Sequence, residues 1–98
     1  MIRVHLPAQL RTLAGVDGEV AVPVADPVTL GRLLDAIEAE YPALIGTIRD
    51  RTNGARRPMV RLFADGEDLS DAAATEPLPE AVTTGRRPFL VVAAIAGG

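Results

Sequence analysis

Hydrophobic and polar residues alternate at two places near the start of the chain. The first is IRVHL at residues 2–6, and the second is VAVPV at residues 20–24, where valines occupy every other position. A period of two predicts half-buried strands. Pro23 cannot donate a backbone hydrogen bond and therefore suits a strand end or a sheet edge. Between the two strands, AQLRTLAG can hold a short helix that is closed by Gly15.

A helical period replaces the alternation in the stretch DPVTLGRLLDAIEAEYP. Thr29 is a plausible N-cap because it directly precedes the apolar run. Pro42 disfavours helical backbone at the residue before it, so we expect the helix to end at Tyr41. One apolar face follows the spacing of three and four residues that a helix requires. Its members are Leu30, Leu33, Leu34, Ile37 and Tyr41.

Three further segments complete the pattern. Residues 59–68, MVRLFADGED, predict a strand that runs into a hairpin turn at Asp65-Gly66, with a short return strand over 67–69. Residues 70–88 form a long connection that is rich in Pro, Ala and Thr and has little periodicity. Residues 89–95, FLVVAAI, are continuously apolar. Such a run predicts a strand that is buried on both faces or covered by a partner.

The order of these elements predicts the fold class. A two-strand unit, one good helix and then more strands favour an α+β domain with a mixed sheet of four to five strands and the main helix across one face. The last strand would lie centrally, beside the first. That arrangement is the β-grasp, or ubiquitin-like, architecture. We expect residues 1–93 to form this domain and residues 94–98 to form a flexible C-terminal tail.

Composition excludes several classes of chemistry. The chain has no cysteine and one histidine, His5, so thiolate metal sites, iron–sulfur clusters and most catalytic triads are excluded. We expect no metal site and no bound cofactor. The net charge is -3, and basic residues occur only singly or in pairs, which argues against nucleic-acid binding. All ten basic residues are arginine, so no side-chain amine is present.

Length and hydropathy bear on domain count and location. The chain has 98 residues, which favours one domain. No stretch approaches the roughly 20 apolar residues that cross a bilayer, and the N-terminal residues lack the apolar core of a signal peptide. We therefore expect a cytoplasmic protein without a membrane partner.

The tail AIAGG is the strongest candidate for chemistry. Gly97 and Gly98 have no side chains, so they could thread a channel too narrow for any other residue. The reactive group would be the α-carboxylate of Gly98, which an enzyme with ATP could convert to an acyl-adenylate. A sulfur nucleophile could then displace AMP and leave a thiocarboxylate. We expect Gly98 to be the natural end of the chain and Ala94, Ile95 and Ala96 to carry it away from the domain.

The chain also resembles the MoaD/ThiS family of ubiquitin-like sulfur carriers. The similar stretches are LPAQLRTLAG, VTLGRLLDAIEAEYPAL, VRLFADGEDL and AAIAGG. Among these carriers, the tail and GEDL are most similar to the actinobacterial CysO type. The resemblance implies a β-grasp protein that is a cosubstrate and not an enzyme. It also implies adenylation by a ubiquitin-activating-like adenylyltransferase/sulfurtransferase, thiocarboxylation at Gly98, and sulfur donation to a downstream biosynthetic enzyme.

A docking face follows from the strand register. If Val60 and Leu62 point to the helix, Arg61 and Phe63 lie on the open face of the sheet; if Phe89 and Val91 point inward, Leu90 and Val92 share that face. An exposed apolar patch of this kind is typical of a partner site. The candidate docking residues are Phe63, Leu90 and Val92, with Arg61, Arg86 and Arg87 at the rim.

Two other functions fit the same residues. The protein could be a ubiquitin-like modifier that is conjugated to other proteins through Gly98, or a non-covalent β-grasp interaction module that uses only its sheet. A ferredoxin-like β-grasp is excluded by the missing cysteines. The final sulfur acceptor stays open among cysteine, molybdopterin, thiamine and secondary-metabolite synthesis.

Overall fold

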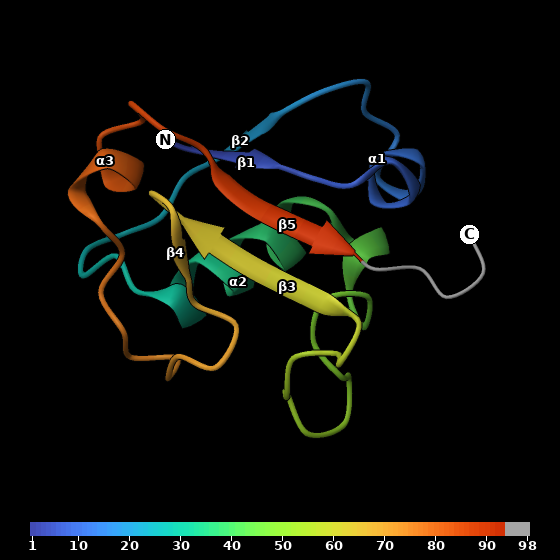
Figure 1. The fold of residues 1–98 in the computed structure, drawn as a ribbon. Coiled ribbons are helices and arrows are strands. Elements are labelled where there is room, and N and C mark those ends of the chain that lie inside the picture. The colour runs from blue at the N-terminus through green and yellow to red at the C-terminus, as the bar shows by residue number, and fades with distance from the viewer. Residues whose placement is uncertain (94–98) are drawn as a thin grey trace.

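A five-stranded mixed sheet forms the centre of the molecule in the computed structural model, which describes residues 1–93 (Figure 1). The strand order is β2-β1-β5-β3-β4. β5 is parallel to β1 and antiparallel to β3, so the last strand lies in the middle of the sheet, beside the first. This confirms the β-grasp prediction. The strands are β1 (Ile2–His5), β2 (Val20–Val22), β3 (Val60–Ala64), β4 (Glu67–Asp68) and β5 (Phe89–Ala93).

One long helix crosses one face of this sheet. It is α2, which is accompanied by two shorter α-helices and a 3-10 turn: α1 (Ala8–Ala14), α2 (Leu30–Glu40), η1 (Pro42–Leu44) and α3 (Glu80–Thr83). The Thr29 hydroxyl caps α2 by accepting a hydrogen bond of 3.3 Å from the backbone N–H of Arg32. Gly15 ends α1 in the left-handed region, at φ 73°. Both boundaries agree with the predicted ones.

The core lies between α2 and the inner face of the sheet. Burial alternates along each long strand: Val60, Leu62 and Ala64 of β3 are buried, and so are Phe89 and Val91 of β5. The apolar face of α2 packs against them. Its buried members are Leu30, Leu33, Leu34 and Ile37.

The continuous apolar run of β5 is not buried on both faces, so that part of the prediction is wrong. Val92 is 44% exposed and Leu90 is half-buried. The reason is geometric: α2 covers only one face of the sheet, and no described element covers the other. The alternative, that a partner covers β5, stays a prediction.

The connection after β4 is more ordered than its composition predicts. It contains α3, and its Leu78 and Val82 are buried in the core. It also runs along the start of α2, where the backbone N–H of Leu30 donates to the Glu76 carbonyl and that of Gly31 to the Ala74 carbonyl, both at 2.9 Å. The connection therefore satisfies helix donors that lack an intrahelical partner.

A half-buried ion pair holds the long segment between α2 and β3 against α2. Arg49 donates two hydrogen bonds to the Glu38 carboxylate, at 2.7 and 3.1 Å, and a third to Asp35 at 2.8 Å. The hydrogen bonds that Arg49 donates to Glu38 are the largest cause of the raised pKa of Arg49. Within residues 1–93, no helix is long and apolar enough to span a bilayer.

Gly31 offers a test of how closely the connection after β4 approaches α2. A Cβ at this position would lie 2.9 Å from the Ala74 Cβ and 3.1 Å from the Ala74 carbonyl oxygen. Alanine gains about 1 kcal/mol of helix propensity over glycine, but the overlap costs about 1–3 kcal/mol. We expect Gly31→Ala to lower the free energy of unfolding by about 1 kcal/mol in urea denaturation. Gly18→Ala is the control, since nothing lies within 4 Å of its added Cβ; equal stability of the two variants would contradict the close approach.

Candidate functional site

The open face of the sheet carries an apolar patch. Phe63 and Leu90 lie directly opposite each other on β3 and β5, and Val92 lies opposite Arg61 in the same ladder. Met59, two residues before Arg61, is 48% exposed and extends the patch diagonally towards Val92. The structure therefore brings Phe63, Leu90 and Val92 together on one face, as the register predicted. Their role in docking stays a prediction.

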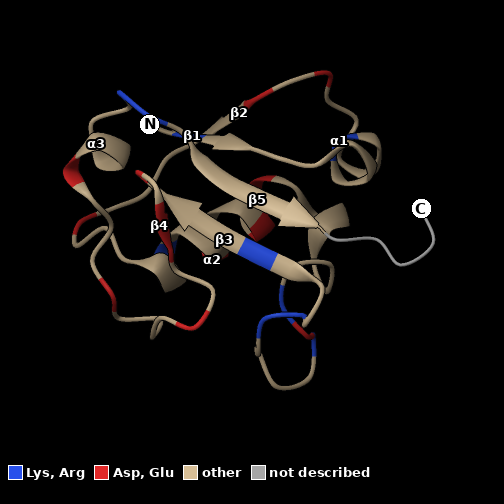
Figure 2. Ribbon diagram, viewed as in Figure 1, with Lys and Arg blue, Asp and Glu red and all other residues tan. Residues whose placement is uncertain are grey.

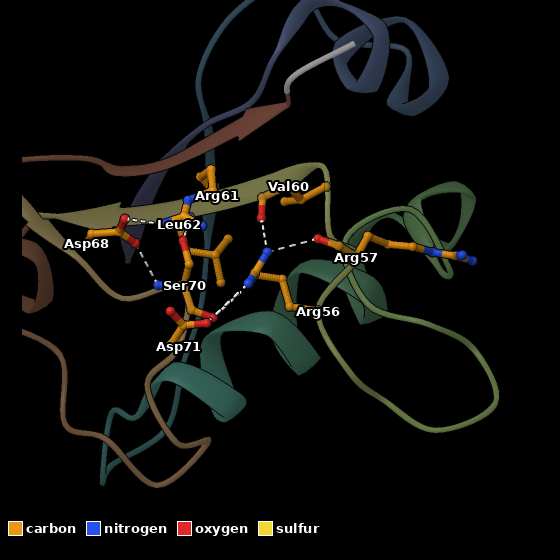
Figure 3. Close-up of polar contacts among 8 residues, drawn as sticks. All are labelled: Arg56, Arg57, Val60, Arg61, Leu62, Asp68, Ser70 and Asp71. Carbon is orange, nitrogen blue, oxygen red and sulfur yellow. Dashed lines mark hydrogen bonds and ion pairs between the residues drawn. The ribbon is translucent and has the colours of Figure 1, made fainter. Parts of the chain in front are cut away.

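Arg61 lies within this patch and is held by an acidic neighbour. Its guanidinium donates a hydrogen bond to the Asp68 carboxylate on β4 (Figure 3). The other carboxylate oxygen of Asp68 accepts from the backbone N–H of Ser70 at 2.8 Å. The hydroxyl and backbone N–H of Ser70, followed by Arg61, lower the pKa of Asp68 to about 2. Asp68 therefore stays ionised at neutral pH and fixes the position of the Arg61 side chain.

The other two rim arginines lie at the end of β5 that is remote from the tail. Both precede Phe89, whereas β5 ends at Ala93. Arg87 forms an ion pair of 2.8 Å with Asp65 and lines a shallow groove beside Leu90. Arg86 lies 3.9 Å from Glu80 instead. The structure thus places Arg61 within the patch and Arg87 at its edge, and it directs Arg86 away, towards α3.

Sequence reasoning did not single out two exposed apolar residues. Leu13 of α1 is 54% exposed, and Ile45, directly after η1, is 42% exposed. Arg57 donates a hydrogen bond of 2.9 Å to the Gly46 carbonyl, which joins the segment after Ile45 to the loop before β3. Ile45 lies in an irregular segment without periodicity, so no sequence signal indicated that it would be exposed here.

One further residue on the open face is His5. It pairs with Leu90 across the parallel β1–β5 ladder, and its side chain is exposed. The alternation of the first strand had placed it on the polar face, and the structure adds that this face is the one that carries the patch. Figure 2 shows one blue band on β3, and Arg61 is the only basic residue of that strand. Four of the ten arginines, Arg49, Arg51, Arg56 and Arg57, lie in the loop before it.

The residues predicted to form the tail lie outside the part of the chain that the structure describes. They are Ala94, Ile95, Ala96, Gly97 and Gly98. What the structure does describe is the strand that precedes them: Ala93, the last residue of β5, pairs with Val60 of β3. Within residues 1–93, no cluster of three or more His, Cys, Asp or Glu side chains could hold a metal ion.

These features define the class of protein: a ubiquitin-like β-grasp domain with an open apolar sheet face. Among solved structures, SAMP1 from Haloferax volcanii is similar at 26% identity with a TM-score of 0.76, covering 98% of this chain and 97% of that one. Mycobacterium tuberculosis CysO is 21% identical, with a TM-score of 0.73, covering 97% of this chain and 100% of that one. A chain of the Amycolatopsis orientalis BexX/CysO complex is 16% identical, with a TM-score of 0.76 and full coverage of both chains.

These structures confirm the resemblance that the sequence motifs indicate at the level of the ubiquitin-like fold. The two CysO-related matches lie below 25% identity and support the fold alone. No family model matches the chain, and no curated protein matches it.

The low pKa of Asp68 predicts a pH-dependent contribution to stability. Because the folded pKa, about 2, lies below the ordinary value of 3.8, the contribution is present above pH 3.8 and is lost as the pH falls towards 2. We expect Asp68→Asn to be less stable than wild type at pH 7, with the difference shrinking between pH 4 and pH 2 in urea titrations. Glu67→Gln is the control, since it removes one charge from the same strand. A difference that did not vary with pH would contradict this role.

Proposed function

We propose that this protein is a sulfur carrier whose C-terminal Gly98 carboxylate is activated and converted to a thiocarboxylate. It acts as a protein cosubstrate rather than as an enzyme. An activating adenylyltransferase/sulfurtransferase supplies the ATP chemistry, and a downstream biosynthetic enzyme takes the sulfur. In this proposal the carrier holds no cofactor of its own, and its activation takes place in the cytoplasm.

The observation that carries the proposal is the position of β5. This strand is bonded on one side to β1 and on the other to β3, and it ends at Ala93, which the sequence AIAGG follows. A reactive group on that segment is attached to a central strand that is bonded on both sides. The similarity to SAMP1, which extends over 98% of this chain, supports the same interpretation.

The proposed chemistry needs two displacement steps. A Gly98 carboxylate oxygen attacks the α-phosphorus of ATP, and pyrophosphate leaves. The sulfur of a sulfide donor then attacks the acyl carbon, and AMP leaves with the carboxylate oxygen that had attacked phosphorus, while the second carboxylate oxygen stays on the acyl carbon. The product is the thiocarboxylate. The chain has no thiol, so the sulfur must come from a donor outside it.

The open face supports a partner that is recognised mainly through apolar contact. Arg61 and Arg87, the charged residues nearest the patch, already pair with Asp68 and Asp65. We propose that the activating enzyme covers Phe63, Leu90 and Val92. A chain with this fold occurs in the BexX/CysO complex, which supports a domain that acts while bound to another protein.

A ubiquitin-like modifier is the second candidate. It is favoured by one specific observation, since the 26% identical relative is a small archaeal modifier protein. In that case the activated Gly98 acyl group would be transferred to amines of other proteins. The final sulfur acceptor in the first candidate stays open among cysteine, molybdopterin, thiamine and secondary-metabolite synthesis.

Intact mass spectrometry separates the two candidates. We expect the protein, incubated with ATP, a sulfide donor and its activating enzyme, to gain the mass of one oxygen-to-sulfur exchange, located on the C-terminal peptide. Deletion of Gly98 should abolish the change, because the tail would no longer reach the ATP. Covalent adducts on denaturing gels without a thiocarboxylate would support the modifier. If neither product formed and the Gly98 deletion kept full activity in the cell, both would be wrong.

Val92→Asp tests the docking face. Val92 is 44% exposed, so the change should leave the fold intact while placing a charge in the proposed apolar contact. We expect kcat/KM of the activating enzyme for the carrier to fall by about tenfold or more. Ala39→Asp, an exposed change on α2, is the matched control because it lies across the core from the open face. Equal loss in both variants would contradict a specific docking face.

A further inference from the structure

The loop between η1 and β3 contains the only asparagine of the sequence, and a glycine follows it. Asn53 and Gly54 are both exposed, and the loop that carries them extends away from the sheet (Figure 1). Gly54 has a φ of 71°, and a Cβ added to it would meet no atom within 4 Å. Because glycine has no side chain, its backbone nitrogen can approach the side-chain carbonyl carbon of the preceding asparagine without a steric clash.

Asp50 holds this loop closed from its start. Its carboxylate accepts hydrogen bonds from the backbone N–H groups of Thr52, at 2.8 Å, and Asn53, at 3.2 Å. These two bonds are the largest causes of a lowered pKa for Asp50, which is therefore ionised at neutral pH. The Asp50 carbonyl accepts from the Gly54 N–H at 2.9 Å, and the Asp50 N–H donates to the Ala55 carbonyl at 2.7 Å. Asp50 thus restrains the backbone on both sides of the Asn53–Gly54 bond.

The Asn53 side chain is held by a separate hydrogen bond. Its Oδ1 accepts from the Ala55 backbone N–H at 2.9 Å. This donor withdraws electrons from the Asn53 amide carbon and can stabilise the negative charge that develops on Oδ1 when a nucleophile attacks that carbon. The adjacent nucleophile is the Gly54 nitrogen, whose attack closes a five-membered ring. The loop therefore activates the electrophile, while the bond from Gly54 to the Asp50 carbonyl restrains the nucleophile.

We propose that Asn53 is a site of spontaneous deamidation, and that the hydrogen bond from the Gly54 N–H to the Asp50 carbonyl controls its rate. When this bond opens, hydroxide removes the Gly54 amide proton and the nitrogen forms a bond to the Asn53 side-chain carbon. The bond from that carbon to Nδ2 breaks, and Nδ2 takes a proton from water and leaves as ammonia. Water then opens the succinimide at either carbonyl, which leaves aspartate or isoaspartate at residue 53. This modification is separate from the proposed sulfur chemistry, because it requires neither Gly98 nor the open face.

The two Asp-Gly pairs that the structure describes are weaker candidates for the same ring closure. They are Asp17-Gly18 and Asp65-Gly66. An ionised carboxylate repels the nucleophile, and its oxygen is a poorer leaving group than the nitrogen of an amide that can depart as ammonia. Asp65 is also held by the hairpin turn at φ 49° and by an ion pair of 2.8 Å with Arg87. The reaction is therefore expected at Asn53.

Peptide mapping by mass spectrometry after incubation at mildly alkaline pH tests the site. We expect the folded protein to gain the mass of an NH-to-O exchange, with an isoaspartyl fraction, on the tryptic peptide TNGAR. The rate should be about tenfold lower than in the urea-unfolded chain, since the restraint is of the order of one hydrogen bond. Asn53→Gln should not change, because a glutamine must close a six-membered ring. No conversion of the folded protein by the time the unfolded chain is fully converted would contradict the proposal, and so would an equal mass gain in Asn53→Gln.

Asp50→Ala tests the restraint. The substitution removes the carboxylate that holds the Thr52 and Asn53 backbone, so the bond from Gly54 should open more often and deamidation should become about fivefold faster. Asp50→Asn is the matched control, because it loses the same charge but keeps an oxygen acceptor; its rate should stay close to that of wild type. Equal rates in Asp50→Ala and wild type, or equal acceleration in both variants, would contradict the restraining role. If circular dichroism shows that Asp50→Ala is unfolded, wild type in urea below its unfolding transition is held to the same acceleration.

Discussion

The ladder that fixes β5 between β1 and β3 is the interaction on which the rest of this structure depends. It joins the first strand to the last and places the final segment of the sequence in the middle of the sheet. Residues of β5 must serve two faces at once: Phe89 and Val91 complete the core, and Leu90 and Val92 remain on the open face. The core and the candidate docking surface are thus made by alternate residues of one strand.

Arginine side chains hold the loops against this sheet. Arg49 fastens the excursion after α2 to Glu38, Arg56 bonds to the Val60 carbonyl of β3, and Arg3 joins Glu19 to the carbonyls before β5. Planar guanidinium groups suit this work because each can donate several hydrogen bonds in fixed directions. Many of the arginines therefore bond to other groups of the same chain, which leaves the open face more apolar than a count of arginines suggests.

Sequence periodicity was sufficient to predict the elements in which hydrophobic residues recur at regular spacing. The alternation at Ile2–His5, the Thr29 cap and the Asp65-Gly66 turn each reflect local backbone and side-chain preferences, and each appears where it was predicted. Short or aperiodic segments were harder to predict from the sequence. α3 has only four residues, and its burial depends on Val82 meeting a core that distant strands build.

The sequence by itself determined the order of the strands and the main helix, the β-grasp class and the apolar character of the final strand, because these follow from local periodicity and composition. Tertiary structure alone decided which face of β5 stays open, that Arg86 and Arg87 lie far from the end of that strand, and that Arg56 and Ser70 bond to β3. These outcomes depend on pairing between residues distant in the chain, such as Leu62 with Ser70 or Val4 with Phe89. Local sequence patterns do not predict such pairs, since the two residues come together only once the sheet has formed.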